Sequence, residues 1–129
     1  MSSRINLDAL SQFEWLIMNH VWNLEKVSAR EVMEALPGEA QRAYTTIQTY
    51  MERLVEKGYL TKEKIGMVNF YTSSVPREEV VDGATSSFID RVFQGSGSSL
   101  AAYLLKNRKL DPDDLKKIKD LLQEGADHD

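Results

Sequence analysis

The chain contains no cysteine. This absence excludes a disulfide framework, a thiolate nucleophile and a thiolate metal site, and it is consistent with a reducing compartment. No run of about 20 apolar residues occurs anywhere, and the N-terminal stretch lacks the apolar segment of a secretory signal. We therefore expect a cytoplasmic protein with no segment inserted in a membrane.

A positive net charge is also absent. The 129 residues include 16 basic and 20 acidic side chains, which gives a net charge of −4, whereas proteins that bind nucleic acids are usually basic. The acidic excess lies mainly in the C-terminal part, and residues 42–64 carry more basic than acidic side chains. The composition therefore allows a local phosphate-facing surface but does not require one.

The sequence shows no set of residues typical of an enzyme. It has no glycine-rich phosphate loop and no nucleophile with a matching base. Its two histidines, His20 and His128, lie too far apart in the sequence to suggest a zinc site, and His20 is interpreted as a structural or half-exposed residue. We expect no catalysis, no cofactor and no metal.

Helix signals dominate the first half of the chain. Ser11 with Glu14, and Ser28 with Glu31, have the spacing of capping boxes and predict two helix starts. A third helix is predicted in "RAYTTIQTYMERLVEKGYL", residues 42–60, where Ile47, Met51 and Leu54 recur at helical spacing. Gly58 is expected to end this helix in a left-handed conformation.

The period then changes from helical to alternating. Residues 60–64 and 68–72 are predicted to form two short strands joined near Gly66. Three helices followed by a hairpin within about 65 residues is the arrangement of a winged helix-turn-helix, in which the third helix enters the major groove.

Three further helices are predicted, over 76–94, 98–110 and 111–124, with a flexible break at 95–99. Asp111 is expected to cap the last helix and Gly125 to follow its end. The predicted fold class is mainly α with a small β-hairpin. A winged-helix DNA-binding domain would span 1–74, and a helical dimerisation segment 75–129.

The face of the third helix opposite Ile47 and Met51 is unusual for a solvated surface. The side chains predicted to point outward are Thr45, Gln48, Thr49, Glu52, Arg53 and Glu56. Gln can pair with adenine and Arg with guanine, and Thr can contact a thymine methyl or a phosphate. Two interpretations stay open at this point, a base-contacting helix and an ordinary amphipathic helix. The two glutamates count against DNA.

The predicted hairpin also allows two interpretations. Lys62 and Lys64 lie on one face of their strand and can either contact phosphate or protect a sheet edge from aggregation. Phe70 and Tyr71 point to opposite faces, so at most one of them belongs to the core.

The C-terminal helices carry more leucine than a thin segment can cover by itself. Each buried side chain of this kind contributes about 1.5–3 kcal/mol before entropy, which favours a partner surface. A second copy is the simplest partner, and folding back onto the first domain is the alternative. The residues assigned to dimerisation are Leu100, Leu104, Leu105, Leu115, Ile118, Leu121 and Leu122.

A resemblance to a known family rests on several motifs. The stretches "LSQFEWLIMNHVWNLEKVSAREVMEAL", "AYTTIQTYMERLVEKGYL" and "NFYTSSV", with the later "FIDRVFQGSGSSLAAYLLKNRKLDPDDLKKIKDLL", resemble the penicillinase repressor family of BlaI/MecI-type regulators. The resemblance implies a homodimeric repressor on an inverted-repeat operator. By position, Thr46, Thr49 and Arg53 match the family's groove-facing helix, and Lys62, Lys64 and Tyr71 match its wing.

The resemblance also implies release by proteolysis. Family members are cleaved in the C-terminal segment downstream of a membrane sensor protease, and the matching bond is Tyr103–Leu104 in "SLAAYLLKN", in place of the usual Asn-Phe pair. The copper-responsive branch uses C-terminal cysteines, which are absent here, so thiolate copper sensing is excluded.

We therefore predict a sequence-specific transcriptional repressor that binds double-stranded DNA as a homodimer. Base contacts are assigned to Thr46, Gln48, Thr49 and Arg53. Phosphate and wing contacts are assigned to Arg42, Thr45, Lys62, Lys64 and Tyr71. The alternative is a winged-helix module that binds another protein and not DNA, which the net negative charge favours.

Overall fold

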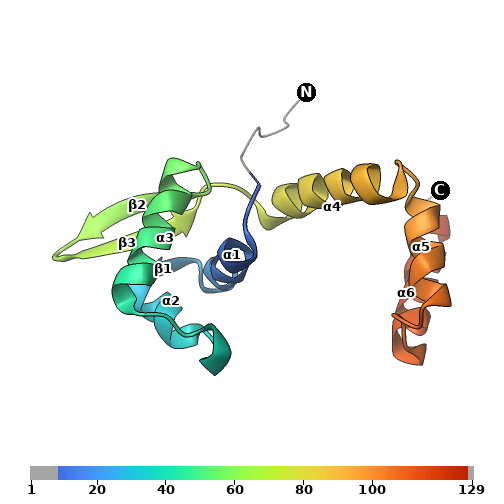
Figure 1. Ribbon diagram of the computed structural model, residues 1–129, viewed down its shortest axis with the longest axis horizontal. Coiled ribbons are helices and arrows are strands. Elements are labelled where there is room, and N and C mark those ends of the chain that lie inside the picture. The colour runs from blue at the N-terminus through green and yellow to red at the C-terminus, as the bar shows by residue number, and fades with distance from the viewer. Residues whose placement is uncertain (1–8, 128–129) are drawn as a thin grey trace. The chain divides into compact units, whose positions relative to one another are not determined.

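The structure, a computed structural model, describes residues 9–127 (Figure 1). It divides into two compact units, of which the first ends at Ala84 and the second begins at Thr85. The first unit contains α1 (Gln12–Leu24), β1 (Lys26–Ser28), α2 (Ala29–Ala35), a 3-10 turn η1 (Gly38–Ala40), α3 (Tyr44–Glu56), β2 (Leu60–Ile65) and β3 (Val68–Ser73). The helix α4 (Arg77–Phe93) crosses from the first unit to the second, which also holds α5 (Gly97–Lys106) and α6 (Pro112–Asp127).

Both predicted capping boxes are confirmed. The Ser11 hydroxyl accepts from the Glu14 backbone N–H at 3.3 Å, and the Glu14 carboxylate accepts from the Ser11 N–H at 2.8 Å. Ser28 and Glu31 repeat this exchange at 3.2 and 2.9 Å. Each box satisfies backbone donors that the first turn of a helix leaves unpaired, so α1 and α2 begin where the sequence predicts.

The sheet has one strand more than predicted. Its order is β1-β3-β2, and both pairings are antiparallel. The predicted hairpin is confirmed as β2 and β3, with Gly66 at a φ of 65° in the turn between them. β1 places Val27 opposite Tyr71. It has only three residues, which is too short for an alternating pattern to be recognised in the sequence.

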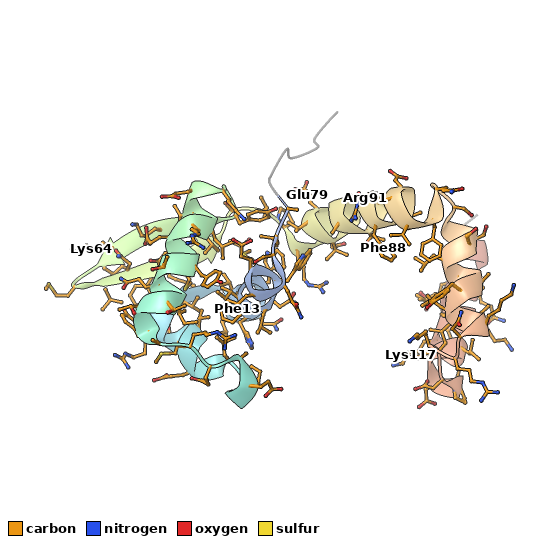
Figure 2. All side chains as sticks on the ribbon, viewed as in Figure 1. Phe13, Lys64, Glu79, Phe88, Arg91 and Lys117 are labelled. Atoms are coloured by element: carbon orange, nitrogen blue, oxygen red, sulfur yellow. The ribbon has the colours of Figure 1, made fainter. Side chains whose placement is uncertain are left out.

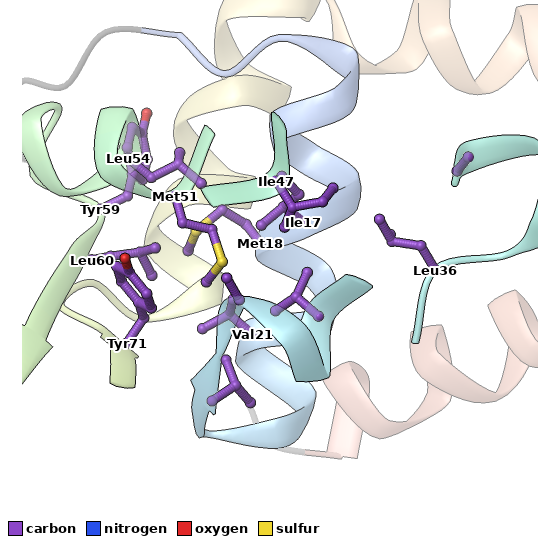
Figure 3. Close-up of a cluster of buried hydrophobic side chains, with 14 of the residues drawn as sticks. Ile17, Met18, Val21, Leu36, Ile47, Met51, Leu54, Tyr59, Leu60 and Tyr71 are labelled. Atoms are coloured by element: carbon purple, nitrogen blue, oxygen red, sulfur yellow. The ribbon is translucent and has the colours of Figure 1, made fainter. Parts of the chain in front are cut away.

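The core of the first unit lies where the three helices meet the sheet (Figure 3). The predicted stripe of α3 is confirmed, because Ile47, Met51 and Leu54 are all fully buried. They share the core with Ile17, Met18, Val21, Val32, Tyr59, Leu60 and Tyr71. This packing fixes which face of α3 is turned away from the protein.

The indole of Trp22 contacts the chain where it leaves the sheet. The Trp22 Nε1–H on α1 lies 2.9 Å from the Ser73 hydroxyl and 3.1 Å from the Val75 carbonyl. Val75 is buried and Pro76 follows it, immediately before α4 begins. The end of β3 and the start of α4 are therefore attached to the same side chain.

The second unit contains α5, α6 and the C-terminal part of α4. Asp111 caps α6 as predicted, accepting from the Asp114 backbone N–H at 2.8 Å. The predicted break at 95–99 is too long, because Ser96 caps α5 and accepts from the Ser99 N–H, so Gly97–Ser99 are helical. The predicted end at Gly125 is also wrong, since α6 continues to Asp127. Gly125 therefore lies inside α6, where a glycine lowers helix stability by about 1 kcal/mol relative to alanine.

The predicted domain boundary between residues 74 and 75 stays a prediction. Within residues 9–127, no helix combines the length and the apolar character needed to cross a bilayer.

Candidate nucleic-acid interface

The turn before α3 is held by side-chain hydrogen bonds. The Gln41 amide donates to the carbonyl oxygens of Met33 and Leu36, at 3.0 and 2.7 Å, where α2 ends. The Met33 carbonyl also accepts from the Leu36 backbone N–H at 3.3 Å, so Gln41 adds a second donor there and supplies a partner to the Leu36 carbonyl at the helix end. The angle at which the chain enters α3 is therefore fixed from outside the helix.

The outward face of α3 carries the predicted side chains. Thr45, Thr49 and Arg53 are exposed, whereas Thr46 and Gln48 are half-buried at the two sides of this face. The Thr49 hydroxyl donates to the Thr45 carbonyl at 2.9 Å. Its methyl group and its remaining acceptor capacity are then directed outward.

One flank of α3 carries two guanidinium groups that lie over aromatic rings. Arg53 lies over the Tyr50 ring, 5.6 Å from its centroid, and Arg42 lies over the Phe13 ring at 5.1 Å. The Phe13 and Tyr50 rings contact each other at a centroid distance of 4.8 Å and an angle of 55°. Phe13 belongs to α1 (Figure 2). The four side chains form one continuous cluster, which was not predicted because Phe13 is distant in sequence from the other three.

The opposite flank of α3 is tied to the hairpin by Glu52. Its carboxylate accepts from the Lys62 ammonium at 2.9 Å and from the Tyr71 hydroxyl at 2.5 Å. The hydrogen bond from Tyr71, and then that from Lys62, lower the pKa of Glu52. Burial and the neighbouring carboxylate raise the pKa of Tyr71. Glu52 is therefore ionised and paired, and it does not present a free negative charge to DNA.

The prediction that Tyr71 contacts DNA is wrong. Its side chain is only 1% exposed, and its hydroxyl is directed at Glu52 inside the protein. The alternation of β3 predicted that at most one of Phe70 and Tyr71 belongs to the core, and Tyr71 is the buried one, opposite Val27 of β1.

The hairpin presents both charged and apolar groups. Lys64 is exposed near the far end of β2 (Figure 2), whereas Lys62 keeps only part of its donor capacity because it pairs with Glu52. An ammonium has three donors, so Lys62 can contact a phosphate while it keeps this pair. At the tip of the hairpin, Met67 is 92% exposed.

The model of the penicillinase repressor family matches residues 10–124. The chain belongs to this family. An uncharacterised 16.5 kDa protein of Latilactobacillus sakei is 33% identical, over 94% of this chain and 83% of its own length. The penicillinase repressor of Staphylococcus aureus is 25% identical, over 89% of this chain and 91% of its own length.

Solved structures agree with the family assignment. The solution structure of the DNA-binding domain of the repressor BlaI is similar at a TM-score of 0.51 and 28% identity, over 57% of this chain and 90% of that one. Family and fold together identify the chain as a winged-helix DNA-binding repressor and not an enzyme. No group of three or more potential metal ligands occurs among residues 9–127, and His128 lies outside the described residues.

The second unit of this penicillinase repressor family member leaves its apolar side chains uncovered. From residue 85 to residue 125, no side chain is buried in the single chain. The residues assigned to dimerisation are half-buried at Leu100 and Leu104 and exposed at Leu105, Leu115, Ile118, Leu121 and Leu122. Leu121 and Leu122 reach 64% and 69% exposure. Such a surface is typical of an interaction site.

The predicted cleavage bond lies inside a helix. Tyr103 and Leu104 belong to α5, and Tyr103 is 47% exposed with its ring 6.1 Å from that of Phe93. Proteases bind extended chains at exposed, locally opened segments. Cleavage at this bond would therefore require the last turns of α5 to unwind.

Proposed function

We propose that this repressor binds an inverted-repeat operator as a homodimer, with α3 of each copy in a major groove. The exposed face of α3 carries this proposal, because Thr49 and Arg53 stand outward from a helix whose opposite face is fully buried. Thr46, Gln48, Thr49 and Arg53 contact bases. A guanidinium such as that of Arg53 can donate two parallel hydrogen bonds to guanine O6 and N7.

Phosphate contacts position α3 in the groove. Arg42 and Thr45 flank the start of α3, and Lys64 extends from the wing, so these groups face the backbone on either side of the groove. Lys62 supports the wing through Glu52 and has donors left for a phosphate. Pairing of Glu52 removes the objection that its negative charge raises against DNA binding.

The second unit supplies the dimer contact. Two copies related by a two-fold axis would cover each other's exposed leucines, and the same axis would match the symmetry of an inverted repeat. Cleavage at Tyr103–Leu104 would detach α6 and the end of α5 from the DNA-binding domain. Loss of the dimer contact would then release the operator, and a membrane sensor protease would start this sequence of events.

The DNA contact is tested by selecting bound sequences from a random duplex pool, followed by titration at matched salt. We expect a two-fold symmetric consensus and an affinity that falls steeply with salt. Arg53→Ala should cost about 1–3 kcal/mol at the consensus site. Arg91→Ala removes an exposed arginine of the second unit and serves as the matched control. Wild-type affinity for Arg53→Ala would contradict the role of α3.

The dimer is tested in solution. Leu121→Glu places a charge on an exposed leucine while keeping a good helix former. Sedimentation equilibrium should show weaker self-association for this variant, and operator affinity should fall while half-site affinity stays constant. Lys116→Glu on the same helix is the control. A monomeric wild-type protein at high concentration would refute the dimer without affecting the DNA contact.

The cleavage site is tested by mass spectrometry of the chain recovered from induced cells. A fragment that ends at Tyr103 is expected. Fragments that end only within the first unit would contradict the assignment.

A further inference from the structure

We propose that Phe13 and Tyr50 are positioning residues for DNA binding, which hold Arg42 and Arg53 in place before the operator arrives. This inference rests on the proposed function, because it concerns the two guanidinium groups assigned to the operator. Neither aromatic residue was among the predicted site residues. The two rings contact each other, and each cation lies over one of them.

The two rings belong to the rigid part of the first unit. Phe13 is on α1 and Tyr50 on α3, and both are half-buried and packed against the core cluster. Their contact, at a centroid distance of 4.8 Å, joins the first turn of α1 to the middle of α3. A guanidinium over such a ring therefore contacts a group that the folded core holds in place, although the arginine side chain itself is exposed.

Stacking leaves the arginines able to bind. The attraction between a cation and a ring uses the flat face of the guanidinium, whereas its five N–H donors lie in its plane and point outward. Arg42 uses one donor on the Gln41 carbonyl at 2.8 Å, and its other donors remain available. The arrangement restricts where each guanidinium lies without using the groups that contact bases and phosphates.

The consequence for binding is a lower entropic cost. A long arginine side chain loses rotamer freedom when it contacts DNA, and a side chain that is already restricted loses less. For an exposed cation over one ring, the attraction corresponds to a factor of about 2 to 5 in an equilibrium constant. We expect each ring to raise operator affinity by a factor of that order.

The test separates positioning from packing by a double-mutant cycle. Tyr50→Leu removes the ring and keeps an apolar side chain, whereas Tyr50→Phe keeps the ring and removes only the hydroxyl. Tyr50→Leu should raise the Kd for the selected operator about 2- to 5-fold, and Tyr50→Phe should bind like wild type. In the Arg53→Ala background, Tyr50→Leu should have no further effect. Equal losses in both backgrounds would show a general packing effect and would overturn the inference.

The salt dependence supplies a second readout. Positioning does not change the number of counterions released, so Tyr50→Leu should weaken binding at every salt concentration with the same slope of log Kobs against log salt. Arg42→Ala should reduce the slope by about one if Arg42 contacts a phosphate. A reduced slope for Tyr50→Leu would contradict a purely positioning role.

A third measurement does not require DNA. In the free protein, the side-chain protons of Arg53 should show an upfield ring-current shift in NMR spectra, retained in Tyr50→Phe and lost in Tyr50→Leu. Absence of this shift in the wild-type protein would overturn the inference even if the operator is bound. An Arg53→Ala variant with wild-type operator affinity would instead refute the proposed function.

Discussion

Replacing Lys57 with methionine should destabilise the first unit strongly at neutral pH, although Lys57 is not among the residues assigned to the DNA contact. The Lys57 ammonium lies 2.9 and 3.0 Å from the two carboxylate oxygens of Glu14. Glu14 is only 3% exposed, and the same carboxylate completes the capping box of α1 with Ser11. The pair joins the first turn of α1 to the end of α3.

The magnitude follows from what the substitution leaves behind. Methionine keeps most of the length of lysine but removes the charge, so the buried Glu14 carboxylate loses its cation. Breaking a buried ion pair in this way costs about 3–5 kcal/mol. The Lys57 side chain is 27% exposed, so water recovers part of the loss. We expect about 2–3 kcal/mol, which lowers the melting temperature of a domain of this size by about 10–20 °C.

The contribution of the Glu14–Lys57 pair to stability depends on pH. Burial raises the pKa of Glu14, but the hydrogen bonds and charge of Lys57, together with Ser11, outweigh burial and lower it below 4.5. Ionised Glu14 therefore stabilises the wild-type fold above about pH 4.5, and this contribution is lost as the pH falls through the folded pKa. Without Lys57 the pKa of Glu14 rises. The difference between variant and wild type should then be largest at pH 7 and shrink as the pH falls through the raised pKa of Glu14 in the variant and then through its lowered pKa in the wild type.

The assay is urea unfolding, followed by the fluorescence of Trp15 and Trp22 on α1, at one protein concentration and at several pH values. Lys26→Met is the matched control, because its pair with Glu63 is exposed on both sides and is worth less than about 1 kcal/mol. A Lys57→Met protein as stable as the control at pH 7, or a difference that does not change with pH, would refute the reasoning.

Three further predictions concern the first unit. Tyr71→Phe removes the hydroxyl that donates to Glu52 and should lower the free energy of unfolding by about 1–2 kcal/mol at pH 7. Because this hydrogen bond lowers the pKa of Glu52, urea unfolding should show a smaller loss of stability at pH 3. An equal loss at both pH values would contradict the pairing. Ser28→Ala removes the cap of α2 and should cost about 1 kcal/mol in the same assay; unchanged stability would mean that the capping box does not hold α2. In Gly66→Ala, the added methyl group has no atom within 4 Å, but the alanine has to adopt a φ of 65°. Thermal unfolding should therefore show a loss of about 1 kcal/mol in stability. An unchanged stability would indicate a different turn.

Much of the fold is predictable because its signals are local. The boxes at Ser11 and Ser28 and the stripe of Ile47, Met51 and Leu54 depend on residues a few positions apart, and the structure confirms them. β1 escaped prediction because its only support is a pairing with β3, more than forty residues later in the chain.

The candidate site was less accessible to prediction because its interactions span the chain. Glu52 was interpreted as a charge opposed to DNA, whereas its partners are Lys62 and Tyr71 on the hairpin. The exposed positions of Thr49 and Arg53 follow from helical periodicity alone, and so does the closeness of Tyr50 to Arg53, but the Phe13 ring under Arg42 does not. A periodic pattern shows which way a side chain points, and only the tertiary structure shows what it lies against.

The Trp22 indole N–H contacts the end of β3 and the segment that precedes α4, so the fluorescence of this residue reports on the junction between them. A pull transmitted along α4 would load the hydrogen bond from Arg77 to Asn19 and the packing of Val80, together with the contacts of the Trp22 indole N–H at Ser73 and Val75. Their rupture would expose that indole to water and shift its emission to longer wavelength. Opening of this junction can therefore be followed by intrinsic tryptophan fluorescence, to which Trp15 also contributes, without any attached dye.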